Sequence, residues 1–322
     1  MIQNQIINGI KAGDTLALAK GITLVESQKP EHRKQAFEIV SALYDHRKDS
    51  IRLGITGIPG VGKSTFIESL GTHITKQGLR LAVLAIDPSS SRTAGSILGD
   101  KTRMEELSRN EMAFIRPSPS SGTLGGVSAR TRESMLMCEA AGYDVILIET
   151  VGVGQSETEV INITDTFIML GMPGTGDELQ GIKRGIMETA DLIVINKADG
   201  DNVTPAKRAK SQIEMALHLF PAAESGWGPK VILASGLHGN GVKECWNNLV
   251  DRQSTINNNG WLLQNRKRQQ SRAFQRLAEL SIYEQMMHQL NHQKELSLIQ
   301  AELQSGEINE FEATLSLLQL IS

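Results

Sequence analysis

The sequence predicts an α/β fold: a doubly wound, mostly parallel sheet with helices before it and a helical extension after it. Three observations predict this class: short apolar runs without polar alternation, helical patterns between the runs, and a glycine-rich motif directly after the first run. At 322 residues, a rule of about 150 residues per domain allows about two structural units. We expect an N-terminal helical segment at 1–50, a central α/β domain at 51–255 and a C-terminal helical extension at 256–322.

Composition and charge exclude several classes of protein. The net charge of −3 and the aromatic content of 4% argue against a nucleic-acid partner. The two cysteines, Cys138 and Cys245, form no CxxC pair, which argues against a zinc ribbon or a disulfide framework; both are expected to be buried. The amino end lacks the pattern of a signal peptide, and no apolar run approaches the ~18 residues that cross a bilayer. These features predict a soluble cytoplasmic protein with no membrane partner.

Helices are expected on both sides of the central domain. Asp14 is a good N-cap, and the helix after it places three apolar residues on one face, Leu18, Ile22 and Val25. A second helix carries Phe37, Val40 and Leu43. After about Asn259 the helical spacing returns, and a last helix is expected at Phe311–Ile321. The apolar faces of these C-terminal helices need cover from the core domain or from a second copy of the chain.

Seven apolar runs are the expected strands of the sheet. Several of them lack alternating polar residues, which is typical of parallel strands that are covered on both faces. Ligands of such sheets bind at the carboxyl ends of the strands, so the residues just after each run are the candidates for function. The runs are Ile51–Thr56, Leu81–Ile86, Ala113–Ile115, Val145–Ile148, Phe167–Leu170, Leu192–Ile195 and Val231–Leu233.

A phosphate-binding loop is the strongest motif in the chain. It follows the first strand and opens a helix, as the GxxxxGK[ST] mechanism requires. The glycines let backbone N–H groups surround phosphate oxygens, Lys63 neutralises the β and γ phosphates, and the Ser64 hydroxyl is a magnesium ligand. The predicted nucleotide-binding residues are Gly57, Ile58, Pro59, Gly60, Val61, Gly62, Lys63, Ser64 and Thr65.

A second motif predicts that the base is guanine. Asn196, Lys197 and Asp199 form NKxD directly after the sixth strand. A carboxylate there accepts hydrogen bonds from N1–H and the exocyclic amine of guanine, whereas adenine presents an acceptor at N1. A loop of Ser235, Gly236 and Leu237 follows the seventh strand, where backbone amides would close over the base.

Three acidic residues follow other strands. Glu149 stands where P-loop enzymes place a carboxylate for magnesium; most GTPases have Asp there, so we expect the longer side chain to reach the metal through water. Asp87 and Asp100 are candidates for the metal's water shell or for orienting the attacking water, and the alternative for each is a helix cap or a solvated loop charge. Gln155 is not assigned as the water-positioning residue. The glycine-rich segment 171–181 is typical of a nucleotide switch.

Taken together, these strings resemble the methylmalonyl-CoA mutase-associated GTPases, the MeaB/ArgK family of the SIMIBI class of P-loop GTPases. The resemblance covers about residues 10–255, and its most specific strings are GSILGDKTRM at 95–104 and ETVGVGQSE at 149–157. One departure is Gly236, where relatives usually have alanine. Because backbone amides contact the base there, we expect the contact to survive.

The resemblance implies a homodimer that hydrolyses GTP slowly, binds an adenosylcobalamin-dependent acyl-CoA mutase and gates or protects its cofactor loading. It implies that Asp87, Asp100 and Glu149 belong to the magnesium and catalytic shell with Lys63, and that the 171–183 loop is a switch coupled to the partner. The cofactors implied are GTP or GDP and Mg²⁺. The chain has no DxHxxG segment, so it is not expected to hold the cobalamin itself.

Two alternatives belong to other classes. A nickel-insertion GTPase would need His-rich or Cys-containing metal loops, which the sequence lacks. A P-loop kinase linked to amino-acid transport would transfer phosphate to an acceptor and would not need Asn196 and Asp199 to select guanine. No arginine finger can be singled out, because Arg92, Arg103 and Arg116 all lie near expected strand ends.

Overall fold

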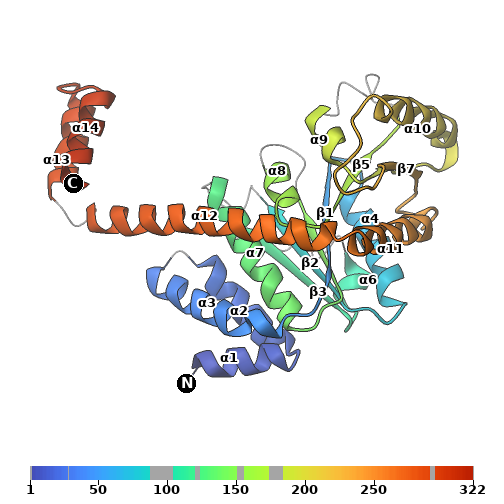
Figure 1. The fold of residues 1–322 in the computed structure, drawn as a ribbon, viewed down its shortest axis with the longest axis horizontal. Coiled ribbons are helices and arrows are strands. Elements are labelled where there is room, and N and C mark those ends of the chain that lie inside the picture. Colours follow the sequence, from blue (N-terminus) through green and yellow to red (C-terminus); the bar gives the residue numbers. More distant parts are fainter. Residues whose placement is uncertain are drawn as a thin grey trace. The chain divides into compact units, whose positions relative to one another are not determined.

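The fold is built around a parallel sheet, as the sequence predicts. The structure is a computed structural model that describes residues 2–27, 29–87, 104–119, 124–150, 156–173, 184–290 and 294–321. Within these ranges the sheet has seven strands in the order β3-β2-β4-β1-β5-β6-β7, and every pair is parallel (Figure 1). The strands are β1 (Ile51–Gly57), β2 (Leu81–Asp87), β3 (Ala113–Pro119), β4 (Val145–Glu149), β5 (Thr166–Gly171), β6 (Leu192–Ile195) and β7 (Lys230–Leu233).

Each of the seven predicted apolar runs is therefore a strand. The largest difference is β3, which was expected to end at Ile115 but continues to Pro119. It pairs with β2 along its whole length and forms an edge of the sheet. An edge strand tolerates Pro117 and Pro119. Proline has no backbone N–H, but no hydrogen bond of the sheet is lost where that position faces away from the neighbouring strand.

Helices cover both faces of the sheet. On one face α4 (Lys63–Thr75), α6 (Glu105–Ser108) and α11 (Val242–Asn258) share an apolar core with alternate strand residues such as Leu53, Ile55 and Leu147. On the other face the core is shared by α7 (Leu124–Ala140), α8 (Ser156–Ile161), α9 (Arg184–Thr189), α10 (Val203–Leu217) and the N-terminal helices. Strand residues alternate between the two cores, which explains the absence of a polar face in the strand sequences.

The N-terminal layer contains one helix more than the sequence predicted. The two expected helices are α2 (Thr15–Glu26), capped by Asp14 through a 2.8 Å bond to the Leu16 amide, and α3 (Pro30–Leu43) with a short 3-10 turn, η1 (Tyr44–His46), after it. The additional helix is α1 (Ile2–Lys11), which buries Ile6 and Ile10 against the same core. A ten-residue helix is marginal alone, so tertiary packing stabilises α1.

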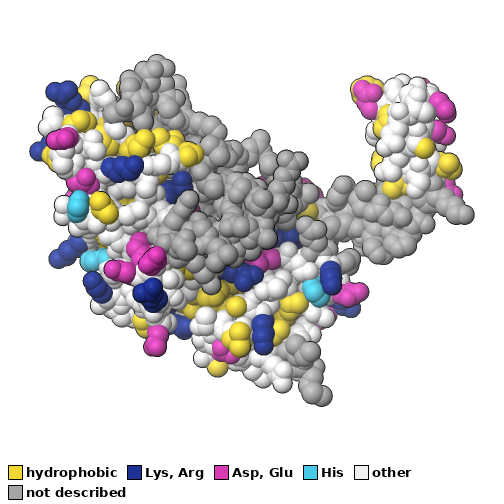
Figure 2. Space-filling view, turned by 180° about the vertical axis from the view of Figure 1, so that it is seen from behind, with side chains coloured by type: hydrophobic (Ala, Val, Ile, Leu, Met, Phe, Trp, Pro, Cys, Tyr) yellow, Lys and Arg dark blue, Asp and Glu magenta, His cyan; other side chains and the backbone are white. Residues whose placement is uncertain are grey.

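Both cysteines are free and buried, as expected. Burial raises the pKa of both thiols, that of Cys245 to about 12, so both are protonated at neutral pH. No described helix has both the length and the hydropathy needed to span a bilayer. On the face drawn in Figure 2, basic and acidic side chains of the described residues are interspersed.

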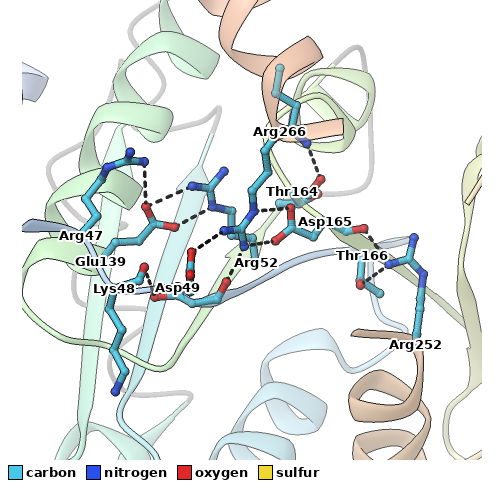
Figure 3. Close-up of polar contacts among 12 residues, drawn as sticks. Arg47, Lys48, Asp49, Arg52, Glu139, Thr164, Asp165, Thr166, Arg252 and Arg266 are labelled. Carbon is cyan, nitrogen blue, oxygen red and sulfur yellow. Dashed lines mark hydrogen bonds and ion pairs between the residues drawn. The ribbon is translucent and has the colours of Figure 1, made fainter. Parts of the chain in front are cut away.

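A buried polar network lies where the strands begin, at the end of the sheet away from the predicted site (Figure 3). Arg52 of β1 makes two hydrogen bonds to Glu139 of α7, at 2.6 and 3.1 Å. Arg266, on α12 (Trp261–Leu290), makes a two-bond pair with Asp165 at 3.1 and 2.6 Å and donates to the Ser50 carbonyl at 2.7 Å. These contacts tie the starts of β1 and β5 to α7 and to the first turns of α12.

The chain separates into two compact units, residues 1–269 and 270–322. The second unit contains the end of α12, α13 (Lys294–Ser305) and α14 (Glu310–Ile321). Asn309 and Glu312 form a reciprocal capping box at the start of α14, with three bonds of 3.0 Å. Apolar side chains remain exposed on this unit beside acidic ones (Figure 2).

Candidate functional site

The phosphate-binding loop connects β1 to α4, as the motif requires. Gly62 has a φ of 89°, a conformation that favours glycine, and no side chain of the described residues caps the first turn of α4. The N-terminal amides of this helix carry the positive end of the helix dipole, which favours an anion such as a phosphate. Lys63 Nζ donates to the Gly57 carbonyl at 2.6 Å, so the ammonium lies over the loop.

Asn196 joins this loop to the predicted base loop. It follows β6 and is buried; its Nδ2 donates to the Val61 carbonyl at 2.9 Å, and its Oδ1 accepts from the Gly236 amide at 2.9 Å. Lys197 is the non-glycine residue with positive φ among the described residues, at 57°, and its Nζ donates to the Gly60 carbonyl at 2.7 Å. The sequence predicted the phosphate-binding loop, the NKxD motif and the loop at 235–237 as separate segments. The side-chain amide of Asn196 connects them.

The base loop holds Asp199 in place. Ser235 is buried, and its hydroxyl donates to Asp199 Oδ2 while it accepts from the His238 amide at 3.2 Å. A Cβ on Gly236 would lie 2.9 Å from the backbone N and Cα of Phe66, so glycine lets this loop pack directly against α4. Leu237 is 75% exposed. The structure thus brings Asn196, Asp199 and the loop at 235–237 beside the start of α4.

The acidic candidates follow adjacent strands. Glu149 ends β4, opposite Ile55 of β1 and Ala85 of β2 in the strand register. It is two residues beyond Leu147, which belongs to the same core cluster as the α4 residues, so Glu149 faces the side of the sheet that α4 covers. Asp87 ends β2, two residues beyond Ala85. Its side chain, Asp100, Gln155 and residues 174–183 lie outside the described part of the chain.

A magnesium ion fits the chemistry of the described donors. Ser64 supplies a hydroxyl on the first turn of α4, and Glu149 supplies a carboxylate from the neighbouring strand end. Hydroxyl and carboxylate oxygens suit a hard cation that keeps several of its waters. Over the residues that the structure covers, no group of three or more His, Cys, Asp or Glu is arranged to hold a metal.

Two threonines near this site were not among the predicted residues, and one of the three candidate arginines is described. Thr150 follows Glu149, and its amide donates to the Ile55 carbonyl at 3.0 Å, which continues the pairing of β4 with β1 past the strand end. The Thr56 hydroxyl, next to the phosphate-binding loop, is buried and has no hydrogen-bond partner within the part of the chain that the structure describes. Arg116, one of the three arginines near strand ends, is paired with Glu26 of α2. Arg92 and Arg103 lie outside the described residues.

Comparisons with known proteins show the family of the chain. Residues 18–291 match the family profile of the methylmalonyl-CoA mutase-associated GTPase MeaB. The chain is 51% identical over 263 residues to the GTPase ArgK of Escherichia coli K12, covering 82% of this chain and 80% of that protein. It is 42% identical to the mouse protein named methylmalonic aciduria type A homolog, mitochondrial, covering 95% and 76%.

A solved structure is similar over almost the whole chain. The crystal structure titled LAO/AO transport system kinase aligns with a TM-score of 0.75 at 37% identity, covering 99% of this chain and 97% of that one. The α/β fold and the GTPase class predicted from the motifs are both confirmed by these relationships. The chain belongs to the MeaB family of methylmalonyl-CoA mutase-associated GTPases.

Proposed function

We propose that this GTPase binds GTP with Mg²⁺ at the site between the phosphate loop and the base loop, and that its nucleotide state controls association with an adenosylcobalamin-dependent acyl-CoA mutase. The observation that carries the nucleotide site is Asn196, whose amide contacts both the phosphate loop and the base loop. Through these contacts the phosphate-binding loop and the carboxylate of Asp199 lie on the same side of the sheet, where the strands end.

Guanine recognition is assigned to Asp199. Its carboxylate accepts from N1–H and the exocyclic amine of guanine, and the Ser235 hydroxyl orients it by donating to one oxygen. The amides of Gly236 and Leu237 lie in the loop that would contact the base. Lys197 extends over the phosphate loop to Gly60, where its aliphatic chain offers a surface for the base plane.

Phosphate binding is assigned to the amides of 57–65 and to Lys63, whose ammonium neutralises the β and γ phosphates. Ser64 and Glu149 would hold Mg²⁺, with Asp87 and Asp100 in its water shell. The ion, when bound, neutralises charge on the phosphate oxygens. Hydrolysis is in-line attack of water on the γ-phosphate, oriented by the acidic set. Because Arg116 is paired with Glu26, we do not assign it as an arginine finger. We expect slow intrinsic turnover because the family resemblance implies it.

The partner is assigned from the family name and the relatives. The glycine-rich segment at 171–183 comes at the end of β5, which lies next to β1 in the sheet. In this proposal its conformation depends on whether a γ-phosphate is bound, and the mutase binds one conformation better than the other. In this proposal the GTPase gates loading of the mutase with its cofactor or protects the loaded enzyme. The chain acts as a homodimer through its C-terminal helices.

The nucleotide assignment is tested by calorimetry of the whole chain with GTP, GDP and ATP in the presence of Mg²⁺. We expect uptake of both guanine nucleotides and at least tenfold weaker uptake of ATP, because adenine has an acceptor where guanine donates. Equal uptake of ATP, or no uptake of GTP, would contradict the assignment.

The partner assignment is tested by capture from native cytosol with the protein loaded with GDP or with a non-hydrolysable GTP analogue. We expect an acyl-CoA mutase to be recovered in amounts that depend on the nucleotide. Recovery of a hydrogenase subunit or a permease would instead favour a nickel-insertion GTPase or a transport-linked kinase. A kinase would also transfer the γ-phosphate of labelled GTP to an acceptor, which a GTPase does not.

A further inference from the structure

Arg132 of α7 is a buried cation with an unmet hydrogen bond. The residue is 7% exposed, and within the part of the chain that the structure describes its Nη1 has no hydrogen-bond partner. Burial and the nearby Arg52 lower the pKa of Arg132 to about 10, so the guanidinium still carries its charge at neutral pH. A buried charge without a partner is costly, and buried charges in native proteins are therefore almost always paired.

The carboxylate that lies on the same side of α7 is already engaged. Glu139 comes seven residues after Arg132, which places the two residues on one face of the helix. Both oxygens of Glu139 accept from Arg52, at 2.6 and 3.1 Å, and Oε2 also accepts from Arg47 at 3.5 Å (Figure 3). One carboxylate therefore already serves two guanidinium groups before Arg132 is considered.

Other acidic side chains near this end of the sheet are paired elsewhere. Glu133, the next residue of α7, accepts two hydrogen bonds from Arg33, at 2.5 and 2.7 Å. Asp144 pairs with Lys48.

The charged side chains that act on Arg132 are Arg52, Glu139 and Arg47. Three guanidinium groups against one carboxylate give this cluster a net charge of +2.

The cluster can be reached from the surface at η1. The Arg47 side chain is 22% exposed, and its guanidinium lies over the Tyr44 ring, 3.7 Å from the ring centroid. Tyr44 begins η1 and is itself close enough to act on Arg132. A small ion can therefore approach Arg132 from solvent beside Arg47 and Tyr44.

We propose that Arg132, Arg47 and Arg52 bind a small oxyanion, such as phosphate, at the end of the sheet away from the nucleotide site. An oxyanion supplies the acceptor that Arg132 Nη1 lacks and offsets the excess positive charge, and its geometry suits planar guanidinium groups. Arg47 follows η1, Arg52 lies on β1 and Arg132 lies on α7, so the bound ion joins three elements and stabilises the fold. This inference does not rest on the proposed function.

The first test is thermal unfolding of the whole chain, saturated with GDP and Mg²⁺, as inorganic phosphate is added. Sodium chloride at equal ionic strength is the reference for screening. We expect a saturable rise in melting temperature, of about 2 °C when phosphate is at ten times its dissociation constant. The same rise is expected in Lys63→Ala, because the proposed anion is not bound at the phosphate-binding loop.

Substitutions in the cluster locate the effect. Arg132→Met removes the charge and keeps an apolar side chain of similar length, so it should lose the saturable rise. Arg47→Met removes a more exposed member of the cluster and should raise the half-saturating phosphate concentration at least fivefold. Arg208→Met, at an exposed arginine of α10, is the matched control and should behave as the wild type does. The general stabilisation by excluded phosphate acts on all variants and does not saturate.

A wild-type protein that phosphate stabilises no more than chloride does would overturn the proposal. So would an equal saturable rise in Arg132→Met, because the phosphate would then bind elsewhere. If Arg132→Met does not fold, Arg47→Met decides, and an unchanged half-saturating concentration in that variant counts against the site.

Crystals of the GDP complex grown with selenate give a direct view, since the selenium of this oxyanion scatters anomalously. We expect an anomalous peak in contact with the Arg132 guanidinium. Peaks at other places only would contradict the proposal. A peak at Arg132 without the saturable rise in solution would show an adventitious ion only, and would contradict it as well.

Discussion

At the scale of single residues, the site depends on side chains whose neighbours hold them in one arrangement. Asn196 contacts two loops with one amide, and Ser235 holds one oxygen of Asp199. Lys63 is the counterpart at the other end of the site, held over the phosphate loop by the Gly57 carbonyl. Because each of these groups has a defined role in the proposal, each can be tested by a single substitution.

Asp199→Asn should convert the base preference from guanine to xanthine. The side-chain oxygen of asparagine still accepts a hydrogen bond from N1–H of the base. Its NH₂ group, however, donates at the position where the second carboxylate oxygen accepted. A donor there suits the C2 carbonyl of xanthine and opposes the C2 amine of guanine. A lost charge-assisted bond of about 1.5–3 kcal/mol predicts GTP affinity lower by roughly 10- to 150-fold. Competition binding with GTP and XTP measures both changes. Asp201→Asn, at an exposed aspartate two residues away, should keep the guanine preference.

Lys63→Ala should reduce kcat for GTP hydrolysis by at least about 100-fold, because removing one group that stabilises developing charge costs about that much. A phosphate-release assay at saturating GTP measures it. Lys76→Ala, an exposed lysine at the other end of the same helix, serves as the control and should turn over normally. Near-normal turnover by Lys63→Ala would refute the assignment of this lysine.

At the scale of elements, the buried ion pairs at the starts of the strands join elements that are far apart in the sequence. Arg266 of α12 reaches Asp165, whose side chain is fully buried, in the turn before β5. Nearby, Arg252 of α11 donates to the Asp165 carbonyl at 2.8 Å and to the Thr166 hydroxyl at 2.7 Å. Burial opposes the charged form of Arg266, but hydrogen bonding and charge from Asp165 outweigh it and raise the pKa of Arg266, so this guanidinium stays charged.

Arg266→Ala should destabilise the protein by about 3–5 kcal/mol, because it leaves the buried carboxylate of Asp165 without its charged partner. Urea unfolding followed by circular dichroism measures the change. The matched control is Arg268→Ala, two residues along the same helix, whose pair with Glu224 is exposed on both sides. An exposed pair contributes about 0–1 kcal/mol, so this variant should unfold near the wild-type midpoint. Equal effects of the two substitutions would contradict this account.

At the scale of the whole molecule, the chain divides into a nucleotide-binding unit and a helical unit with an apolar surface. On α14 the side chains of Phe311, Leu315 and Leu318 are 74%, 62% and 56% exposed and lie on one helical face. An exposed apolar stripe on a short helical unit is typical of an interaction surface, and a second copy of the chain is the occupant that the proposed homodimer requires.

The double variant Phe311→Glu, Leu315→Glu should convert the proposed dimer to a monomer, because two charges would then have to be buried at the contact. Light scattering after size-exclusion chromatography gives the mass of each species. Leu219→Glu places a charge at a similarly exposed leucine of the first unit and should leave the mass unchanged. A double variant that keeps the dimer mass would exclude this face as the contact.

Much of the fold followed from local pattern. Each apolar run became a strand, because a strand covered on both faces needs no polar residues, and this shows in a few consecutive positions. The phosphate loop at 57–65 and the motif at 196–199 were also readable, since their chemistry requires particular residues at fixed spacing. The capping of α2 by Asp14 was predicted for the same reason, because donor and acceptor are two residues apart.

The tertiary structure decided the contacts between residues that are far apart in the chain. The pairing of Arg116 with Glu26, the capping of α6 by Glu68 and the bridge made by Asn196 join residues separated by 38 to 135 positions. The extension of β3 to Pro119 depended on the position of this strand at the edge of the sheet. The formation of α1 depended on an apolar core to which other helices also contribute. Sequence alone determined the family, the strands and the type of nucleotide site. Only folding determined these partners, because a hydrogen bond or a packing contact depends on distance in space, which spacing along the chain does not reveal.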